Sequence, residues 1–168
     1  MQFSIVPYDK SHNKKEFDCN VQELNNYLRE RASQDIRRYY ATMFVAVEEE
    51  TNKVIGYYTL SNASIDLNNV PDEMKKRLPK YPTVPAIRLG RLAVDKSMQG
   101  KGLGGELLAD AVIRSVLNVS AWVLMIVDAK DEVAVAFYKK YGFEQLIDND
   151  KHLFVMRKHL ENFILKNR

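Results

Sequence analysis

A glycine-rich stretch between a predicted strand and a predicted helix constrains this chain more than any other feature. Residues 99–105 read QGKGLGG, with an apolar segment, Ile87–Val94, before them. A helical pattern follows, with apolar residues on one side at Leu107, Leu108, Ala111 and Val112. The first N–H groups of a helix lack helical partners and carry partial positive charge, and glycine allows an anion to approach them. The junction therefore predicts a cradle for a phosphate or pyrophosphate, to which Lys101 adds a point charge.

The remaining periodicities predict an α+β fold in one domain over residues 1–168. We expect strands at 3–8, 43–48, 54–64, 87–94, 122–127, 143–147 and 152–157, and helices at 21–39, after the glycine stretch and at 131–141. Asn20, with Glu23 three residues later, predicts a capping box at the first helix. Residues 87–127 form a strand–helix–strand unit within an otherwise antiparallel order. We therefore expect a mixed sheet with one parallel pair.

Composition narrows the class of protein. Hydrophobic residues make up 46% and charged residues 28% of the 168, as in an ordinary globular protein. No apolar run approaches the roughly 18 residues of a membrane span, and the first residues do not form a secretory signal, so no membrane partner is expected. Cys19 is the only cysteine and the three histidines show no zinc spacing, so we expect no disulfide and no metal. These features predict a cytoplasmic protein, and the net charge of +3 permits a polyanionic partner.

Several phosphate ligands are compatible with the glycine stretch. It does not match the G-x-x-x-x-G-K-[ST] pattern of a Walker A loop. Gly100, Gly102 and Gly105 match G-x-G-x-x-G, with Asp128 at a suitable distance for a ribose contact. The first glycine, however, comes several residues after the strand, and only 63 residues follow Gly105. A nucleotide-dependent oxidoreductase is therefore a distant alternative.

Another pattern fits the same residues better. Gln99-x-x-Gly102-x-Gly104 resembles the [RQ]-x-x-G-x-[GA] loop of the GNAT acyltransferases. Residues 131–143 resemble the later A-x-x-F-Y-x-K-x-G-F signature of that family, with Ala134, Phe137-Tyr138, Lys140 and Gly142-Phe143. The resemblance covers nearly the whole chain and implies a GNAT fold with acetyl-CoA as cosubstrate. The coenzyme-binding residues that it implies are Leu92, Ala93, Val94, Gln99, Gly100, Lys101, Gly102, Leu103, Gly104 and Gly105. Asp131 departs from the family's frequent Asn, so no coenzyme contact is expected there.

The resemblance also implies a direct acetyl transfer to an amine. In this family the parallel strands splay apart, and the strand ending at Val94 offers backbone groups to the coenzyme. Tyr138 is the predicted general acid, because the Tyr of the F-Y pair points at the coenzyme sulfur and its reference pKa of about 10 keeps it protonated at neutral pH. The alternative role for Tyr138 is a core aromatic beside Phe137 and Tyr141. No residue stands out as a general base.

One branch of the family resembles this chain over most of its length. Phe17-Asp18-Cys19, Leu24-Asn25 and Arg88–Asp95 resemble the GNAT toxins of bacterial toxin–antitoxin pairs. The resemblance implies that the acceptor is the α-amino group of aminoacyl-tRNA and that a small antitoxin protein is a partner. Candidate substrate contacts are Arg29, Arg37, Arg38 and Arg91, and a homodimer is possible. A small-molecule amine or protein N-terminus as acceptor, and a non-catalytic coenzyme-A-binding module, are the alternatives.

Overall fold

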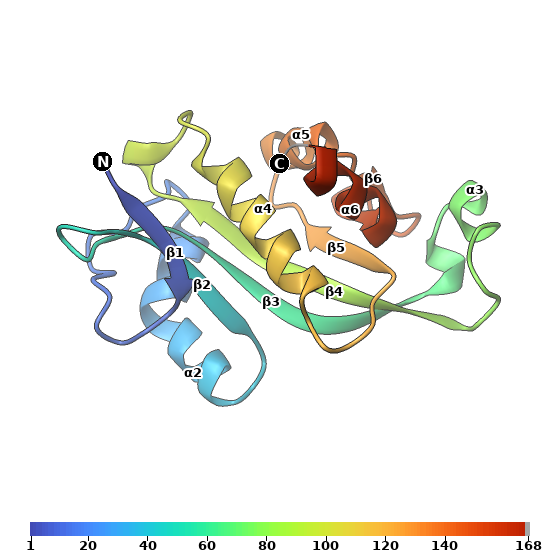
Figure 1. Ribbon diagram of the computed structural model, residues 1–168, viewed down its shortest axis with the longest axis horizontal. Helices are drawn as coiled ribbons and strands as arrows, with labels where there is room; N and C mark the ends of the chain where they lie inside the picture. The colour runs from blue at the N-terminus through green and yellow to red at the C-terminus, as the bar shows by residue number, and fades with distance from the viewer. Residues whose placement is uncertain (167–168) are drawn as a thin grey trace. The chain divides into compact units, whose positions relative to one another are not determined.

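A computed structural model describes residues 1–166, without the side chains of residues 164 and 165 (Figure 1). Seven strands form one sheet: β1 (Phe3–Pro7), β2 (Thr42–Glu48), β3 (Val54–Asp66), β4 (Thr83–Val94), β5 (Leu124–Asp128), β6 (Glu144–Gln145) and β7 (His152–Met156). The helices are α1 (Gln22–Asn26), α2 (Ala32–Arg37), α3 (Asp72–Lys75), α4 (Leu103–Val116), α5 (Glu132–Lys140) and α6 (Arg157–Lys166). Two short 3₁₀ turns, η2 (Leu67–Asn69) and η3 (Lys96–Met98), precede α3 and α4. No described helix has both the length and the apolar character needed to cross a membrane.

The strand order is β1-β2-β3-β4-β5-β7-β6, and β4 and β5 run parallel. The pairs β1–β2, β2–β3, β5–β7 and β6–β7 are antiparallel. This arrangement confirms the predicted α+β class and the predicted parallel pair. The parallel register runs from Ala86↔Leu124 to Leu89↔Val127. It does not extend to Gly90–Val94, the last residues of β4.

The chain packs as two compact units. The first consists of residues 1–61 and 90–112, and the second of residues 62–89 and 113–168. Both β3 and β4 run from one unit into the other. The single domain over residues 1–168 stays a prediction.

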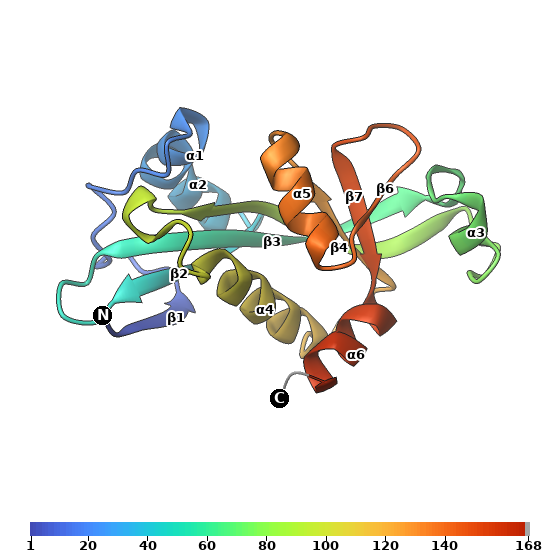
Figure 2. The ribbon, with the colours of Figure 1, turned by 90° about the horizontal axis from the view of Figure 1, so that it is seen from above.

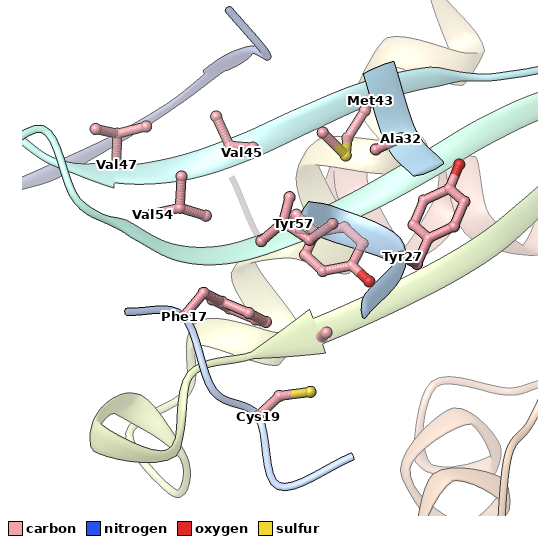
Figure 3. Packing of buried hydrophobic residues seen from close by; sticks show 11 residues of the cluster. Phe17, Cys19, Tyr27, Ala32, Met43, Val45, Val47, Val54 and Tyr57 are labelled. Carbon is pink, nitrogen blue, oxygen red and sulfur yellow. The ribbon is translucent and has the colours of Figure 1, made fainter. Parts of the chain in front are cut away.

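The first unit contains β1, β2 and the adjoining part of β3, with α1 and α2 on one face and the start of α4 on the other (Figure 2). Its core includes the fully buried Phe17, Val45, Val54 and Tyr57, which lie along β2 and β3 (Figure 3). On the opposite face Gly56 allows close approach of α4. A Cβ there would lie 2.9 Å from a methyl carbon of Leu107. The absence of a side chain on β3 therefore positions the helix that follows the glycine stretch.

The long first helix differs from its prediction. Residues 21–39 form α1, a π-helical turn η1 (Tyr27–Arg31) and α2, instead of one regular helix. The predicted capping box at Asn20 is wrong. Val21 precedes the helix, and no side-chain cap hydrogen bond forms there. Asn20 has a φ of 66°, and its N–H donates to the Asp18 carboxylate, so it belongs to a turn held by Asp18.

The second unit contains β5, β7 and β6, and its helices α5 and α6 lie side by side (Figure 1), with the rings of Tyr141 and Phe163 6.1 Å apart. Asp131 caps α5 by accepting a hydrogen bond from the Ala134 N–H at 2.8 Å. At the other end Gly142 has a φ of 91°, and its N–H donates to Lys139 O while the N–H of Phe143 donates to Tyr138 O. This pair of bonds is a Schellman motif, which confirms the predicted end of the helix at glycine.

Candidate active site

The glycine stretch is fixed at its base by a capped turn. Asp95, directly after β4, caps η3 by accepting hydrogen bonds from the N–H and the hydroxyl of Ser97. Its other carboxylate oxygen accepts the Asp18 N–H at 3.0 Å. Burial alone raises the pKa of Asp95, but these hydrogen bonds outweigh it and hold the pKa below its usual range. The turn therefore rests on a buried, ionised carboxylate.

Beyond this turn the backbone takes conformations that favour glycine. Gly100 has a φ of 76° and Gly102 a φ of 88°. A Cβ at either position would meet no atom within 4 Å, so backbone conformation, not crowding, selects glycine there. Within the described part of the chain, no backbone acceptor pairs with the N–H groups of residues 99–105. These N–H groups surround the start of α4, a helix of 14 residues. Anion binding at this loop stays a prediction.

The side chain of Gln99 joins two segments of the backbone. Its amide nitrogen donates to Val94 O at 3.0 Å and to Cys19 O at 3.1 Å. Both donor hydrogens are therefore directed at the protein's own backbone. Gln99 can serve a ligand only through its backbone N–H group. Lys101 is exposed beside it, with its ammonium group available to an anion.

The end of β4 carries the other three predicted coenzyme contacts. Ala93 is buried in the core of the first unit, whereas Leu92 and Val94 are half-buried. The parallel register with β5 stops before all three. Their backbone groups on that edge are therefore not used by the parallel ladder, as the family resemblance predicts.

Tyr138 lies in the second unit, whereas the glycine stretch lies in the first. The Tyr138 side chain is 6% exposed and packs edge-on against Phe137 and beside Phe143. Its hydroxyl makes no hydrogen bond to a described residue. The hydroxyl oxygen is not fully buried. Burial, with the nearby charge of Asp128, raises the pKa of Tyr138. The ring is therefore part of the core, and the hydroxyl stays protonated and uncommitted.

Asp128, whose charge acts on Tyr138, belongs to a group of charged side chains that the sequence did not predict as a cluster. Asp128, at the end of β5, pairs with Arg88 on β4 at 2.9 Å and lies 3.5 Å from His152 Nε2. The other ring nitrogen of His152 lies 3.0 Å from Asp148. The alternation of polar and apolar residues along a strand cannot identify such a group, because its members come from separate segments of the chain. A parallel β4–β5 pair alone does not place Arg88 near Asp128, because Arg88 lies in the middle of β4 and Asp128 at the end of β5. The register Arg88↔Ile126 brings the two side chains together.

The four candidate arginines divide into two pairs. Arg91 lies over the Tyr27 ring, with its guanidinium carbon 3.6 Å from the ring centre. Arg29 donates a hydrogen bond to Phe17 O. Arg37 and Arg38, in contrast, lie at the end of α2 next to Tyr39 and Tyr40, whose side chains are 95% and 75% exposed. Only the second pair is directed to solvent.

No group of three or more metal-ligating side chains is found within residues 1–166. Glu48, on β2, accepts a hydrogen bond from Thr51 in the following turn. Asp66 caps η2. Both carboxylates thus have local structural partners, and neither stands out as a general base.

A family model and a relative of known function both match this chain, and they indicate the same family. The model of the acetyltransferase (GNAT) domain matches residues 39–145, which include both the glycine stretch and Tyr138. A tRNA-acetylating toxin of Mycobacterium tuberculosis (strain ATCC 25618 / H37Rv) is 33% identical over 144 residues, which cover 84% of this chain and 84% of the toxin.

Solved structures extend the similarity to nearly every residue. AtaT complexed with acetyl-methionyl-tRNAfMet matches with a TM-score of 0.87 and 30% identity, over 96% of this chain and 99% of that chain. A mutant AtaT toxin bound to the C-terminus of the antitoxin AtaR and acetyl-CoA matches with a TM-score of 0.80 and 27% identity, over 96% and 97%. This chain belongs to the GNAT acetyltransferase family.

Proposed function

We propose that this protein transfers the acetyl group of acetyl-CoA to the α-amino group of aminoacyl-tRNA and thereby acts as a toxin that blocks translation. The observation that carries the proposal is the row of unpaired N–H groups at residues 99–105, in front of α4. A diphosphate requires several donors at once, and this loop offers them without reorganisation. The similarity to a tRNA-acetylating toxin and to AtaT with acetyl-methionyl-tRNAfMet supports the choice of acceptor.

The coenzyme is assigned to the first unit. The backbone N–H groups of Gln99 through Gly105 receive the diphosphate, and Lys101 adds a positive charge. The backbone of Leu92, Ala93 and Val94, left out of the parallel register, pairs with the pantetheine arm as a further strand would. A backbone N–H near Leu92 or Ala93 polarises the thioester carbonyl. Acetyl-CoA supplies an acetyl group already activated as a thioester.

We assign to Tyr138 the protonation of the leaving thiolate. As the amine nitrogen bonds to the carbonyl carbon, the C–S bond breaks and the sulfur gains an electron pair. The raised pKa of Tyr138 keeps its proton in place until that charge develops, and its hydroxyl has no competing partner in the described chain. The proton that the amine loses passes to solvent, because an α-amino group has a pKa of about 8 and is partly neutral at physiological pH.

The acceptor surface is assigned to the end of α2. Arg37 and Arg38 lie there, and Tyr39 and Tyr40 present aromatic faces on which an RNA base can stack. Arg29 and Arg91 also contact Phe17 and Tyr27 within the first unit, and a contact of these two arginines with RNA stays a prediction. A small antitoxin protein is the proposed regulator and the cytoplasm the proposed location, while a homodimer stays a prediction.

Acetyl transfer from radiolabelled acetyl-CoA tests the proposal. Purified protein is incubated with aminoacyl-tRNA, with the same tRNA after deacylation, and with a panel of small amines and peptides. We expect label in the charged tRNA alone, released as the N-acetyl amino acid after mild base. Label in a small amine or peptide, with none in tRNA, would show that the acceptor is that amine or peptide and not aminoacyl-tRNA. Absence of binding to acetyl-CoA would remove the enzyme assignment altogether.

A further inference from the structure

The segment from Phe17 to Asn25 has no part in the chemistry proposed above, although its residues mark the toxin branch. In the structure it lies against the base of the glycine stretch, about 77 residues away in sequence. Figure 3 shows Phe17 and Cys19 of this segment with the core residues of the first unit. Both parts belong to that unit. The segment therefore has direct access to the proposed coenzyme loop.

Backbone groups make the first connection between the two parts. Asp18 donates its N–H to the buried Asp95 carboxylate at 3.0 Å and accepts the Lys96 N–H on its carbonyl at 2.8 Å. The two bonds run in opposite directions between adjacent chain segments. They fix the turn after β4 in both position and orientation.

Side chains make the second connection. Gln99 donates one hydrogen bond to Cys19 O and another to Val94 O, so one amide group joins the segment, the strand end and the loop. Asp18 contributes its carboxylate, which lies 3.1 Å from Lys96 Nζ. The pKa of Asp18 is lowered to about 2, chiefly by the Asn20 N–H and then by Asn25 and Lys96. The carboxylate is therefore charged at any physiological pH.

Asn25 ties these connections to α1. Its side chain is 3% exposed, donates to the Asp18 carboxylate at 2.9 Å and accepts the Cys19 N–H at 2.9 Å. A buried amide with both ends bonded holds one geometry, because leaving either end unpaired is costly. The segment is thus rigid before any ligand arrives.

We propose that Asp18, Asn25 and the Gln99 side chain are positioning residues for acetyl-CoA, and we call their connected contacts the loop brace. The brace holds the free N–H groups of residues 100–105 in their binding arrangement, so that less conformational freedom is lost when the diphosphate binds. It acts through the loop backbone and touches no reacting atom. The inference rests on the proposed coenzyme site.

Two single variants test the brace. Gln99→Met keeps the backbone N–H and the side-chain length but removes both donors, and Asp18→Asn removes the charge and one acceptor. We expect Gln99→Met to raise the Kd and KM for acetyl-CoA by about 5- to 30-fold, and Asp18→Asn by about 3- to 10-fold. At saturating acetyl-CoA, kcat and the KM for the acceptor stay within twofold of the parent values. Gln2→Met, an exposed position in the same unit with no side-chain bond among the described residues, leaves all constants unchanged.

Two further measurements separate positioning from general destabilisation. Backbone order parameters from NMR relaxation of the ligand-free protein should fall at residues 100–105 in both variants and stay constant at β2 and β5. In the double variant, the loss in affinity should be smaller than the product of the single losses, because both changes relax one structure. A drop in kcat equal to the rise in KM, or unchanged affinity and order parameters, would overturn the brace.

The same experiments distinguish failure of the brace from failure of the proposed function. If the parent protein gives no heat with acetyl-CoA, the coenzyme assignment fails, although the order parameters still report on the loop. If the parent binds and the variants bind equally well, only the brace is wrong.

Discussion

Replacing Tyr138 by phenylalanine tests the proposed chemistry with little change to the fold. The substitution removes one oxygen atom and keeps the ring that packs against Phe137 and Phe143. The hydroxyl makes no hydrogen bond to a described residue, so its removal leaves no buried group unpaired. We therefore expect the free energy of unfolding to change by no more than about 0.5 kcal/mol.

The effect on the reaction should be much larger. General acid catalysis contributes typically about 10²- to 10⁴-fold, so kcat with saturating acetyl-CoA and aminoacyl-tRNA should fall by at least about 100-fold. The Kd for acetyl-CoA should stay within about threefold, because the proposed diphosphate site lies on the glycine stretch and not on Tyr138. Single-turnover transfer of labelled acetyl to tRNA measures the first quantity and calorimetry the second.

The pH profile of the reaction gives an independent check on the direction of the Tyr138 pKa shift. Because the pKa of Tyr138 is raised above its usual value, its proton is retained throughout the range in which tRNA aminoacylation survives. The rate in the parent protein should therefore rise with pH as the acceptor amine, with a pKa of about 8, loses its proton, and should show no fall below about pH 9. A Tyr138→Phe variant that keeps more than about a third of parental kcat would refute the assignment of Tyr138 as the acid.

Further predictions address the loop, the acceptor surface and the fold. Gly102→Ala forces a non-glycine residue to a φ of 88° in open space, so acetyl-CoA affinity should fall severalfold in calorimetry at a stability cost of about 1 kcal/mol. Charge reversal at Arg37 and Arg38 should lower kcat/KM for aminoacyl-tRNA by about tenfold or more and reduce its salt dependence, with the KM for acetyl-CoA unchanged. Because the pKa of Asp18 is lowered to about 2, its contribution to stability is complete above about pH 4 and disappears as pH falls toward 2, so the melting temperature of Asp18→Asn should depend less on pH in that range. Gly56→Ala should lower the melting temperature by several degrees, since the new methyl group meets α4.

Local patterns predicted the parts of the site that depend on local backbone structure. The glycine stretch was identified because positive φ values and a helix start leave a direct mark on residue types, as at Gly100 and Gly102. The end of α5 was predicted for the same reason, because Gly142 occupies a position that favours a left-handed backbone. Tyr138 was found through a motif, and its enclosed ring shows that the core role and the proposed catalytic role belong to the same side chain.

Contacts between distant segments were not predictable in this way. Asn20 and Glu23 have the spacing of a capping box, yet Asn25 and Asp18 take over the hydrogen bonding near the start of α1 because the turn must also meet Asp95. Arg91 was read as a candidate substrate contact because a charge in a central strand is unusual. Its guanidinium faces the Tyr27 ring, a partner from a helical turn far earlier in the chain, which the sequence did not predict. Spacing rules describe neighbours along the chain and carry no information on such pairs.

Any diphosphate-binding loop of this kind must combine free N–H groups with a fixed backbone, and the loop brace allows both. The N–H groups of residues 99–105 have to stay unpaired to receive an anion, so they cannot stabilise their own loop by backbone hydrogen bonds. Rigidity must then come from other atoms. Here Asp95 accepts from Asp18 and Ser97, and Gln99 donates from its side chain, so no bond of the brace uses an N–H group of residues 100–105. The contacts that hold the loop are in this way kept separate from the groups that bind, which explains why a segment near residue 20 constrains a site near residue 100.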